Sequence, residues 1–251
     1  MNIVLIHGLA GSGRYFQDLE LKLQAIPNTR TYAIDLLGFG QNAKHKGPFV
    51  LDKQLEYITE KVNSVFGSSE MVVIGHSMGG ILAANWAFQH TARVKGIVLL
   101  NTPLGSTREE LEQNIGSGET YGWGYLILRH RFIAFLSCKL LCKLNLMRFF
   151  RKFKPAYVSD EVFKDYRLHT WTSVTQNFKN VILTHPLMPT VLKIKEIPIL
   201  NIVATHDNPI SQNLIEGKNV INETIEGEHN LLLEKPEDIF NLIKQFILSL
   251  S

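Results

Sequence analysis

The stretch Met71-Val72-Val73-Ile74-Gly75-His76-Ser77-Met78-Gly79-Gly80 decides the fold, because it runs from an apolar segment straight into a serine between glycines. The apolar residues 71–74 predict a buried strand, and the alanine-rich residues after Gly80 predict a helix. The serine must lie in a very tight turn, where Gly75 and Gly79 leave out the side chains that would not fit. Gly-x-Ser-x-Gly between a strand and a helix is the pattern of a nucleophile elbow, which projects the serine hydroxyl from the sheet edge. The plain alternative is a glycine-rich structural turn with an inert serine.

Short apolar runs alternate with helical patterns along most of the chain. We predict further strands at Asn2–Ile6, Thr29–Ile34, Val94–Leu100, Ile197–Ala204 and Asn219–Ile225. Helices are predicted near Arg14–Ala25, over residues 51–65, after Ser77 and over Pro236–Leu248. Continuous apolar strands separated by helices indicate an α/β fold with a mostly parallel sheet covered on both faces. The functional loops of such a sheet lie at the carboxyl ends of its strands.

This alternation breaks between about residues 104 and 185. The stretch is rich in leucine, phenylalanine and basic residues, and it indicates helices and loops without strands. We therefore expect a core formed by residues 1–103 and 186–251, with a helical insertion of residues 104–185 above the sheet.

A serine nucleophile needs a base, and the base needs an acid that orients it. After a nucleophile elbow these groups follow in the order serine, acid, histidine. The strand predicted to end at Ala204 leads into Thr205-His206-Asp207, and the next strand leads into Glu228-His229. We predict that Asp207 is the acid and that His229 is the base for Ser77. His206 is the nearest rival, but it comes too early for the last strand-to-helix connection.

With these residues in place, the sequence resembles the α/β-hydrolase family over nearly its whole length. The motifs are His7-Gly8, Asp35-Leu36-Leu37-Gly38-Phe39-Gly40, Gly75-His76-Ser77-Met78-Gly79-Gly80, Asp207, Gly227-Glu228-His229 and Glu234-Lys235-Pro236. The resemblance implies a serine esterase or lipase-like enzyme and puts the insertion where the family has its cap, or lid, domain. The family commonly has two antiparallel strands before the His-Gly loop, for which this sequence has no room. We therefore expect a reduced sheet of about six strands.

Catalysis by this route needs hydrogen-bond donors for an oxyanion. We expect one from the backbone amide of Met78, directly after the serine. The resemblance assigns the other to the backbone amide of Leu9, in the loop His7–Gly13. Asp35 is another acid at a strand end, but it precedes the serine, so we expect it to organise the Gly38-Phe39-Gly40 turn. The glycines of the first loop show neither the Gly-Lys-Ser/Thr ending nor the Gly-x-Gly-x-x-Gly spacing of a nucleotide site. We expect no cofactor and no metal.

A serine nucleophile argues against haloalkane dehalogenase and epoxide hydrolase activity, because those relatives use aspartate. The reaction that we favour is hydrolysis of a carboxylic ester through an acyl-enzyme. Apolar residues of the insertion suggest an apolar acyl or alcohol group, although most of them could simply form the insertion's own core. Carbon–carbon bond hydrolysis, or a lyase step like that of menaquinone synthesis, would use the same three residues. That lyase group often has an arginine directly after the nucleophile motif, where this chain has Ile81. A non-catalytic binding protein is the least favoured alternative.

Charge and cysteine content limit the partners. The formal net charge is +3, which gives no reason to expect nucleic acid. Eight basic and no acidic residues fall within 126–154, so weak contact between this segment and an anionic membrane is left open, as is the oligomeric state. Cys138 and Cys142 fit neither a disulfide framework nor a four-ligand zinc site. We expect a cytoplasmic protein without a secretion signal or a membrane-spanning segment.

Overall fold

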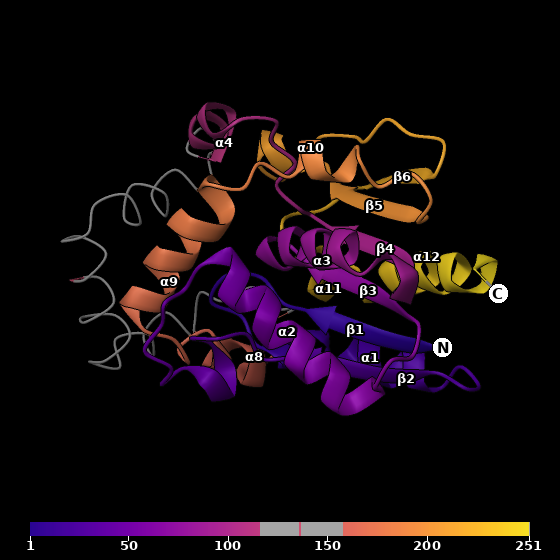
Figure 1. Ribbon diagram of the computed structural model, residues 1–251, viewed down its shortest axis with the longest axis horizontal. Helices are drawn as coiled ribbons and strands as arrows, with labels where there is room; N and C mark the ends of the chain where they lie inside the picture. The colour runs from indigo at the N-terminus through magenta and orange to yellow at the C-terminus, as the bar shows by residue number, and fades with distance from the viewer. Residues whose placement is uncertain (116–135, 137–157, 251) are drawn as a thin grey trace.

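The computed structural model describes residues 1–115, 136 and 158–250. Six strands form one sheet in the order β2-β1-β3-β4-β5-β6, and every neighbouring pair is parallel (Figure 1). The strands are β1 Asn2–Ile6, β2 Arg30–Ile34, β3 Met71–His76, β4 Val94–Leu100, β5 Ile199–Ala204 and β6 Val220–Ile225. The expected parallel sheet of about six strands is therefore confirmed, with β1 and β4 at their predicted bounds.

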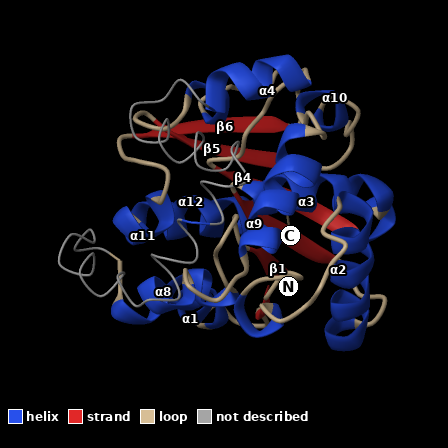
Figure 2. Cartoon of the chain, turned by 90° about the vertical axis from the view of Figure 1, so that its left-hand side faces the viewer, coloured by secondary structure: helices blue, strands red, loops and turns tan. Residues whose placement is uncertain are grey.

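Helices cover both faces of this sheet, as Figure 2 shows. One face packs against α2 and α3, and the other against α1, α11 and α12. Alternate strand residues supply the two cores: Val4 and Ile6 belong to the first, and Ile3 and Leu5 to the second. This division follows from the two-residue period of a strand, and it explains why the strands are apolar throughout. The helices of these layers are α1 Gln17–Gln24, α2 Leu51–Phe66, α3 Met78–Gln89, α11 Leu231–Glu234 and α12 Pro236–Ser249.

Part of the predicted insertion lies among the described residues and contains helices. They are α4 Arg108–Ile115, α8 Asp160–Asp165, α9 Trp171–Asn177 and the π-helix η6 Phe178–Leu183, followed by α10 Met188–Val191. Within the described part of 104–185, β-structure is limited to one isolated antiparallel bridge between Phe39 and His169. The bounds of a separate insertion remain a prediction, because residues 116–135 and 137–157 lie outside the described residues.

Short 3₁₀ helices complete the described structure and mostly follow strands or turns. They are η1 Gly13–Phe16, η2 Gly40–Asn42, η3 Thr91–Arg93 and η7 Pro209–Ser211. The helix predicted near Arg14–Ala25 thus begins as η1 and continues as α1. In the described ranges, no helix combines the length and the apolar character needed to cross a membrane.

The strand order places the site. The chain passes from β1 outward to β2 and then returns to the other side of β1 with β3. The connection after β1 therefore runs toward one side of the sheet and the connection after β3 toward the other, and the two loops diverge at the carboxyl ends of these neighbouring strands. Ligands of open α/β sheets bind at such a switch point, outside the carboxyl ends of the strands. In Figure 1 these ends point toward α4 and α9. The loop His7–Gly13 and Ser77 therefore meet at this edge.

Candidate active site

The turn that carries Ser77 is strained, and glycines make it sterically feasible. Ser77 has φ 53° and ψ −121°, a left-handed conformation that is uncommon for a residue with a side chain. A Cβ atom on Gly75 would lie 2.3 Å from the Gly79 carbonyl oxygen, and one on Gly79 would lie 2.0 Å from the Ile6 carbonyl oxygen. Ser77 donates its backbone N–H to the Leu100 carbonyl over 2.9 Å, which fixes the turn to β4. Strain of this kind gathers at functional sites.

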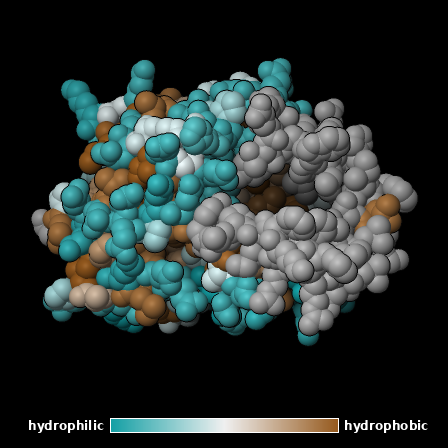
Figure 3. Space-filling view, turned by 180° about the vertical axis from the view of Figure 1, so that it is seen from behind, coloured by the Kyte–Doolittle hydropathy of each residue, from teal (hydrophilic) through white to brown (hydrophobic). Residues whose placement is uncertain are grey.

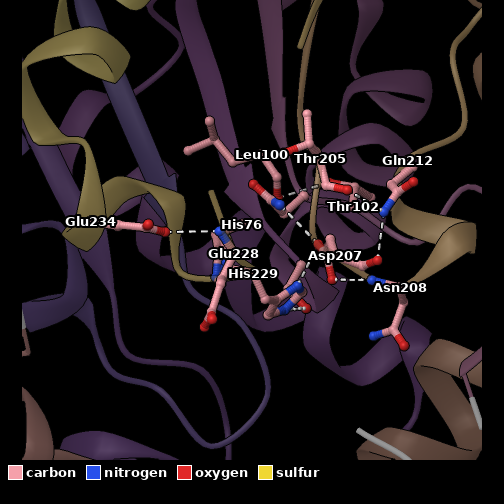
Figure 4. A network of polar contacts seen from close by, with 12 residues as sticks. His76, Leu100, Thr102, Thr205, Asp207, Asn208, Gln212, Glu228, His229 and Glu234 are labelled. Carbon is pink, nitrogen blue, oxygen red and sulfur yellow. Dashed lines mark hydrogen bonds and ion pairs between the residues drawn. The ribbon is translucent and has the colours of Figure 1, made fainter. Parts of the chain in front are cut away.

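Three side chains that are far apart in sequence meet above this turn. His229 follows β6, and its Nε2 atom lies 3.0 Å from Ser77 Oγ. Its Nδ1 atom lies 2.7 Å from Oδ2 of Asp207, which follows β5. A carboxylate can only accept, so Nδ1–H donates to Asp207, and the Nε2 lone pair is left to accept the serine proton. Figure 4 shows Asp207 and His229 facing one another at the strand ends.

Asp207 is held charged within the protein. Its side chain has no exposed surface, and burial alone would raise the pKa of its carboxyl group. Attraction to His229, together with hydrogen bonds from His229, Asn101 and the Asn208 backbone, outweighs burial and lowers the pKa of Asp207. The carboxylate therefore stays ionised and can stabilise a positive charge on His229.

Sequence reasoning missed Asn101. This fully buried residue follows β4 with φ 47°, and its Nδ2 donates to Asp207 Oδ2 over 2.8 Å. The only signals in the sequence were its place at a strand end and the tolerance of asparagine for positive φ. Asn208 adds a second donor, because its backbone N–H lies 2.6 Å from Asp207 Oδ1.

Other histidines near the site have different partners. His206, the rival base, is exposed, and its backbone N–H donates to the Gly227 carbonyl. His7 is fully buried; it accepts from the Leu36 N–H at Nε2, so that Nδ1–H donates to the Gly8 carbonyl over 2.7 Å. Burial lowers the pKa of His7 and keeps it neutral. His76 donates from Nε2 to the His229 backbone carbonyl over 2.9 Å.

The two amides expected to bind an oxyanion flank Ser77. Met78 is the first residue of α3, where backbone N–H groups point outward and the helix dipole favours negative charge. Leu9 lines the same cavity as Ser77, in the loop after β1. Across the described residues, neither amide is engaged in a backbone hydrogen bond outside regular helices and strands. Both lie at the switch point, and their role as donors remains a proposal.

Two carboxylates hold the loop that contains Leu9. Asp35 accepts from the Gly13 N–H over 2.6 Å and from the Gln41 N–H over 2.9 Å, so it joins this loop to the turn after β2. The sequence predicted a structural role for Asp35 in that turn, but not its bond to the first loop. Asp165, from α8, accepts from Ser12 Oγ over 2.7 Å and from Arg14 Nε over 2.9 Å. The described part of the insertion is thus fastened to the first loop.

A cavity of about 280 Å³ opens beside Ser77. Its wall is mostly apolar, with contributions from the first loop, η1, the chain after β4, α4 and η6. These residues are Leu9, Tyr15, Pro103, Ile115, Phe178 and Ile182. Uncharged polar residues after β5 and β6 complete the other side, namely Asn208, Ser211 and Asn230. Figure 3 shows hydrophobic atoms at the floor of a hollow, while the described surface to its left is mainly hydrophilic with scattered hydrophobic residues. Within the described ranges, no group of three or more histidine, cysteine, aspartate or glutamate residues is placed to hold a metal.

Comparison with known proteins identifies the fold family. Residues 2–236 match the sequence profile of the alpha/beta hydrolase fold. The probable lysophospholipase BODYGUARD 2 of Arabidopsis thaliana is 33% identical over 106 residues, which is 41% of this chain and 22% of that protein. A Haemophilus influenzae protein, provisionally named 2-succinyl-6-hydroxy-2,4-cyclohexadiene-1-carboxylate synthase, is 27% identical over 116 residues, or 45% of each chain. The matches thus span less than half of these curated relatives.

Solved structures agree on the architecture. MenH from S. aureus superposes with a TM-score of 0.74 at 16% identity, covering 100% of this chain and 94% of that one. At this identity the likeness concerns the fold alone.

Proposed function

This chain belongs to the alpha/beta hydrolase fold family, and from that premise we propose that it cleaves a carboxylic ester with Ser77 as nucleophile, His229 as base and Asp207 as the acid that orients His229. Members of this family are generally hydrolases. The observation that carries the proposal is the unbroken series of contacts, 3.0 Å from Ser77 to His229 and 2.7 Å from His229 to Asp207. A serine in a strained turn whose hydroxyl faces the Nε2 atom of an imidazole oriented by a carboxylate is placed to be deprotonated.

The proposed reaction has two halves. His229 Nε2 takes the proton of Ser77 as its oxygen attacks the ester carbonyl carbon, and the Met78 and Leu9 amides donate to the resulting oxyanion. His229 then gives the proton to the departing alkoxide, which leaves as the alcohol and forms the acyl-enzyme. Water, deprotonated by His229, attacks the acyl carbon and releases the acid and the free serine. Each oxyanion donor is worth about a hundredfold to a thousandfold in rate in comparable enzymes.

An apolar acyl or alcohol group fits the described cavity. Its wall is dominated by side chains such as Phe178 and Ile182, and none of its described residues is a lysine, arginine, aspartate or glutamate. Burial of a hydrocarbon group against such a wall lowers the free energy of binding, and the wall offers no ion pair to a charged group. The resemblance to a probable lysophospholipase supports a lipid-like ester as the first substrate class to try.

A carbon–carbon hydrolase or a lyase is the second candidate, and the Haemophilus influenzae relative favours it. The product for which that relative is named carries a carboxylate, which an arginine near the nucleophile would suit better than the buried Ile81 of this chain. We therefore rank ester hydrolysis first.

The decisive experiment compares p-nitrophenyl esters of increasing acyl length on wild type, Ser77→Ala and Ser64→Ala. Ser64 is an exposed serine on α2 and serves as the matched control. We expect wild type and Ser64→Ala to hydrolyse at least part of the series, and Ser77→Ala to lose at least about a thousandfold in kcat/KM. Wild type that hydrolyses no ester while a fluorophosphonate still labels it would move the assignment to the second candidate.

Location and membrane contact remain proposals. Apart from residue 136, the basic segment 126–154, with Cys138 and Cys142, lies outside the described residues. We propose a cytoplasmic protein whose partner is a small-molecule ester. Vesicle flotation with and without anionic lipid tests the membrane contact. The contact predicts that the protein binds only vesicles with anionic lipid and that added salt weakens this binding.

A further inference from the structure

The residue before the nucleophile is a buried histidine that the reaction above does not use. His76 is the last residue of β3 and is 5% exposed. Its Nε2 atom lies 2.9 Å from the backbone carbonyl oxygen of His229. A carbonyl can only accept, so His76 carries its proton on Nε2 and donates to the backbone of the residue proposed as the base. The contact joins positions 153 residues apart.

The surroundings of His76 fix its ring and its charge. Tyr15 stacks on it with ring centroids 4.5 Å apart and an angle of 24° between the planes. Gly8 packs so closely that a Cβ atom there would lie 3.1 Å from His76 Nδ1. Burial first, then the neighbouring His229 and His7, lower the pKa of His76 to about 3, while Asp207 and the His229 carbonyl oppose this shift. The ring is therefore a neutral donor at every pH at which the enzyme would work.

The remainder of the His229 loop is held from elsewhere. The Gly227 carbonyl accepts from the His206 N–H, and Glu234 accepts from the Glu228 N–H over 2.8 Å. These contacts fix residues before His229 to the loop after β5 and to α11, but neither joins the loop to the nucleophile turn. The bond from His76 to the His229 carbonyl joins the loop to the nucleophile turn, and it does this at residue 229 itself.

We propose that His76 is a positioning residue, whose Nε2–H bond to the His229 carbonyl sets the distance between the imidazole of His229 and Ser77. This inference rests on the proposed function of Ser77 and His229. The reaction also needs an uncharged His76 ring, because the centroids of His76 and His229 are 5.0 Å apart and His229 must become positively charged during the reaction. A second positive charge at this distance would oppose that step.

Two substitutions separate donation from ring packing. His76→Gln places an amide N–H near the position of Nε2 but removes the ring, whereas His76→Phe keeps a ring against Tyr15 and removes the donor. We expect His76→Phe to lose at least about tenfold in kcat with KM changed by less than about twofold, since small displacements of a reacting group are costly. We expect His76→Gln to stay within about threefold of wild type.

His90, the residue directly after α3, offers a matched control. It stacks on Trp86 at 4.4 Å, and its Nδ1 donates to a backbone carbonyl over 2.9 Å, but it lies at the far end of α3 from Ser77. His90→Phe therefore removes the same kind of contact and should lower the melting temperature without changing kcat. Loss of kcat in both His76 variants alike, or wild-type kcat in His76→Phe, would overturn the proposal.

Nitrogen NMR on wild-type protein with labelled histidines tests the same inference without relying on activity. We expect the His76 signals of a neutral ring protonated at Nε2 throughout pH 5.5–8, and a low-field His229 Nδ1–H signal that His76→Gln keeps and His76→Phe loses. A ring protonated at Nδ1, or one that titrates in this range, contradicts the proposal even if no variant folds. If wild type cleaves no ester while these signals are as expected, the proposed function fails and the positioning contact stands.

Discussion

Asn101 Nδ2 lies 2.8 Å from the same Asp207 oxygen that accepts from His229. The two donors share Oδ2, and the other carboxylate oxygen accepts from the Asn208 backbone. Asn101 thus helps to keep Asp207 ionised and directed at His229, although the side-chain amide of Asn101 takes no part in the reaction itself.

Asn101→Asp tests this relationship with a side chain of the same shape that also tolerates positive φ. Two carboxyl groups about 3 Å apart cannot both ionise readily, so they share a proton and the pKa of the pair rises. We expect kcat/KM to fall by about tenfold near neutral pH and to recover as the pH increases. Measurement of kcat/KM from pH 5 to 9 checks this, and an unchanged profile would remove Asn101 from the account.

Gly79 tests the steric basis of the serine turn. Because a Cβ atom at this position would lie 2.0 Å from a backbone carbonyl oxygen, Gly79→Ala must displace β1 or α3. We expect a loss of at least about 3 kcal/mol in the free energy of unfolding. Gly217→Ala is the control: it is exposed, and its closest contact is a Val220 side-chain carbon at 3.0 Å. Urea unfolding of the two variants compares them, and equal losses would show that the close approach is not the cause.

Stability should fall in acid because His76 is buried as a neutral ring. Its pKa is about 3 in the folded chain against 6.5 when unfolded, so the unfolded chain binds more protons between these values. The stabilisation is present above pH 6.5 and is lost as the pH falls toward 3. His76 alone should cost about 2 kcal/mol between pH 7.5 and pH 5. The lowered pKa values of His7 and Asp207 act in the same direction.

Urea unfolding at several pH values measures this slope. His76→Gln removes the titrating ring and should flatten the profile relative to wild type. An identical slope in the variant would mean that His76 is not held neutral by burial.

Ile182 tests whether the described cavity binds the acyl chain. It lies on η6, is 5% exposed and lines the cavity with Phe178. Ile182→Trp should fill part of the 280 Å³, so kcat/KM for long acyl chains should fall by about tenfold or more relative to short ones. The acyl-length profile provides the measurement. A uniform decrease at all lengths would place the acyl chain elsewhere.

Much of the fold could be predicted because its signals are local. The apolar runs at Asn2–Ile6 and Val94–Leu100 match β1 and β4 residue for residue, and the spacing from Leu51 to Val62 identified the buried face of α2. The strands predicted at Thr29–Ile34, Ile197–Ala204 and Asn219–Ile225 begin one or two residues later, because pairing with the neighbouring strand starts at Arg30, Ile199 and Val220.

The site was harder to predict, because its contacts close over long separations. Chain order was enough to prefer His229 to His206, but it says nothing about which side chains surround Asp207. Asn101 is separated from Asp207 by 106 positions, and Asp165 from Ser12 by 153. Neither has a local pattern that distinguishes it from an ordinary polar residue at the end of a strand or helix.

The most direct test of the account is the reaction of the protein with a fluorophosphonate, followed by intact mass and peptide mapping. We predict one adduct per chain on Ser77 in wild type, none in Ser77→Ala, and labelling slowed by at least about a hundredfold in His229→Gln. A folded wild-type protein that forms no adduct, or that forms one on another residue, would contradict the claim that Ser77 is an activated nucleophile.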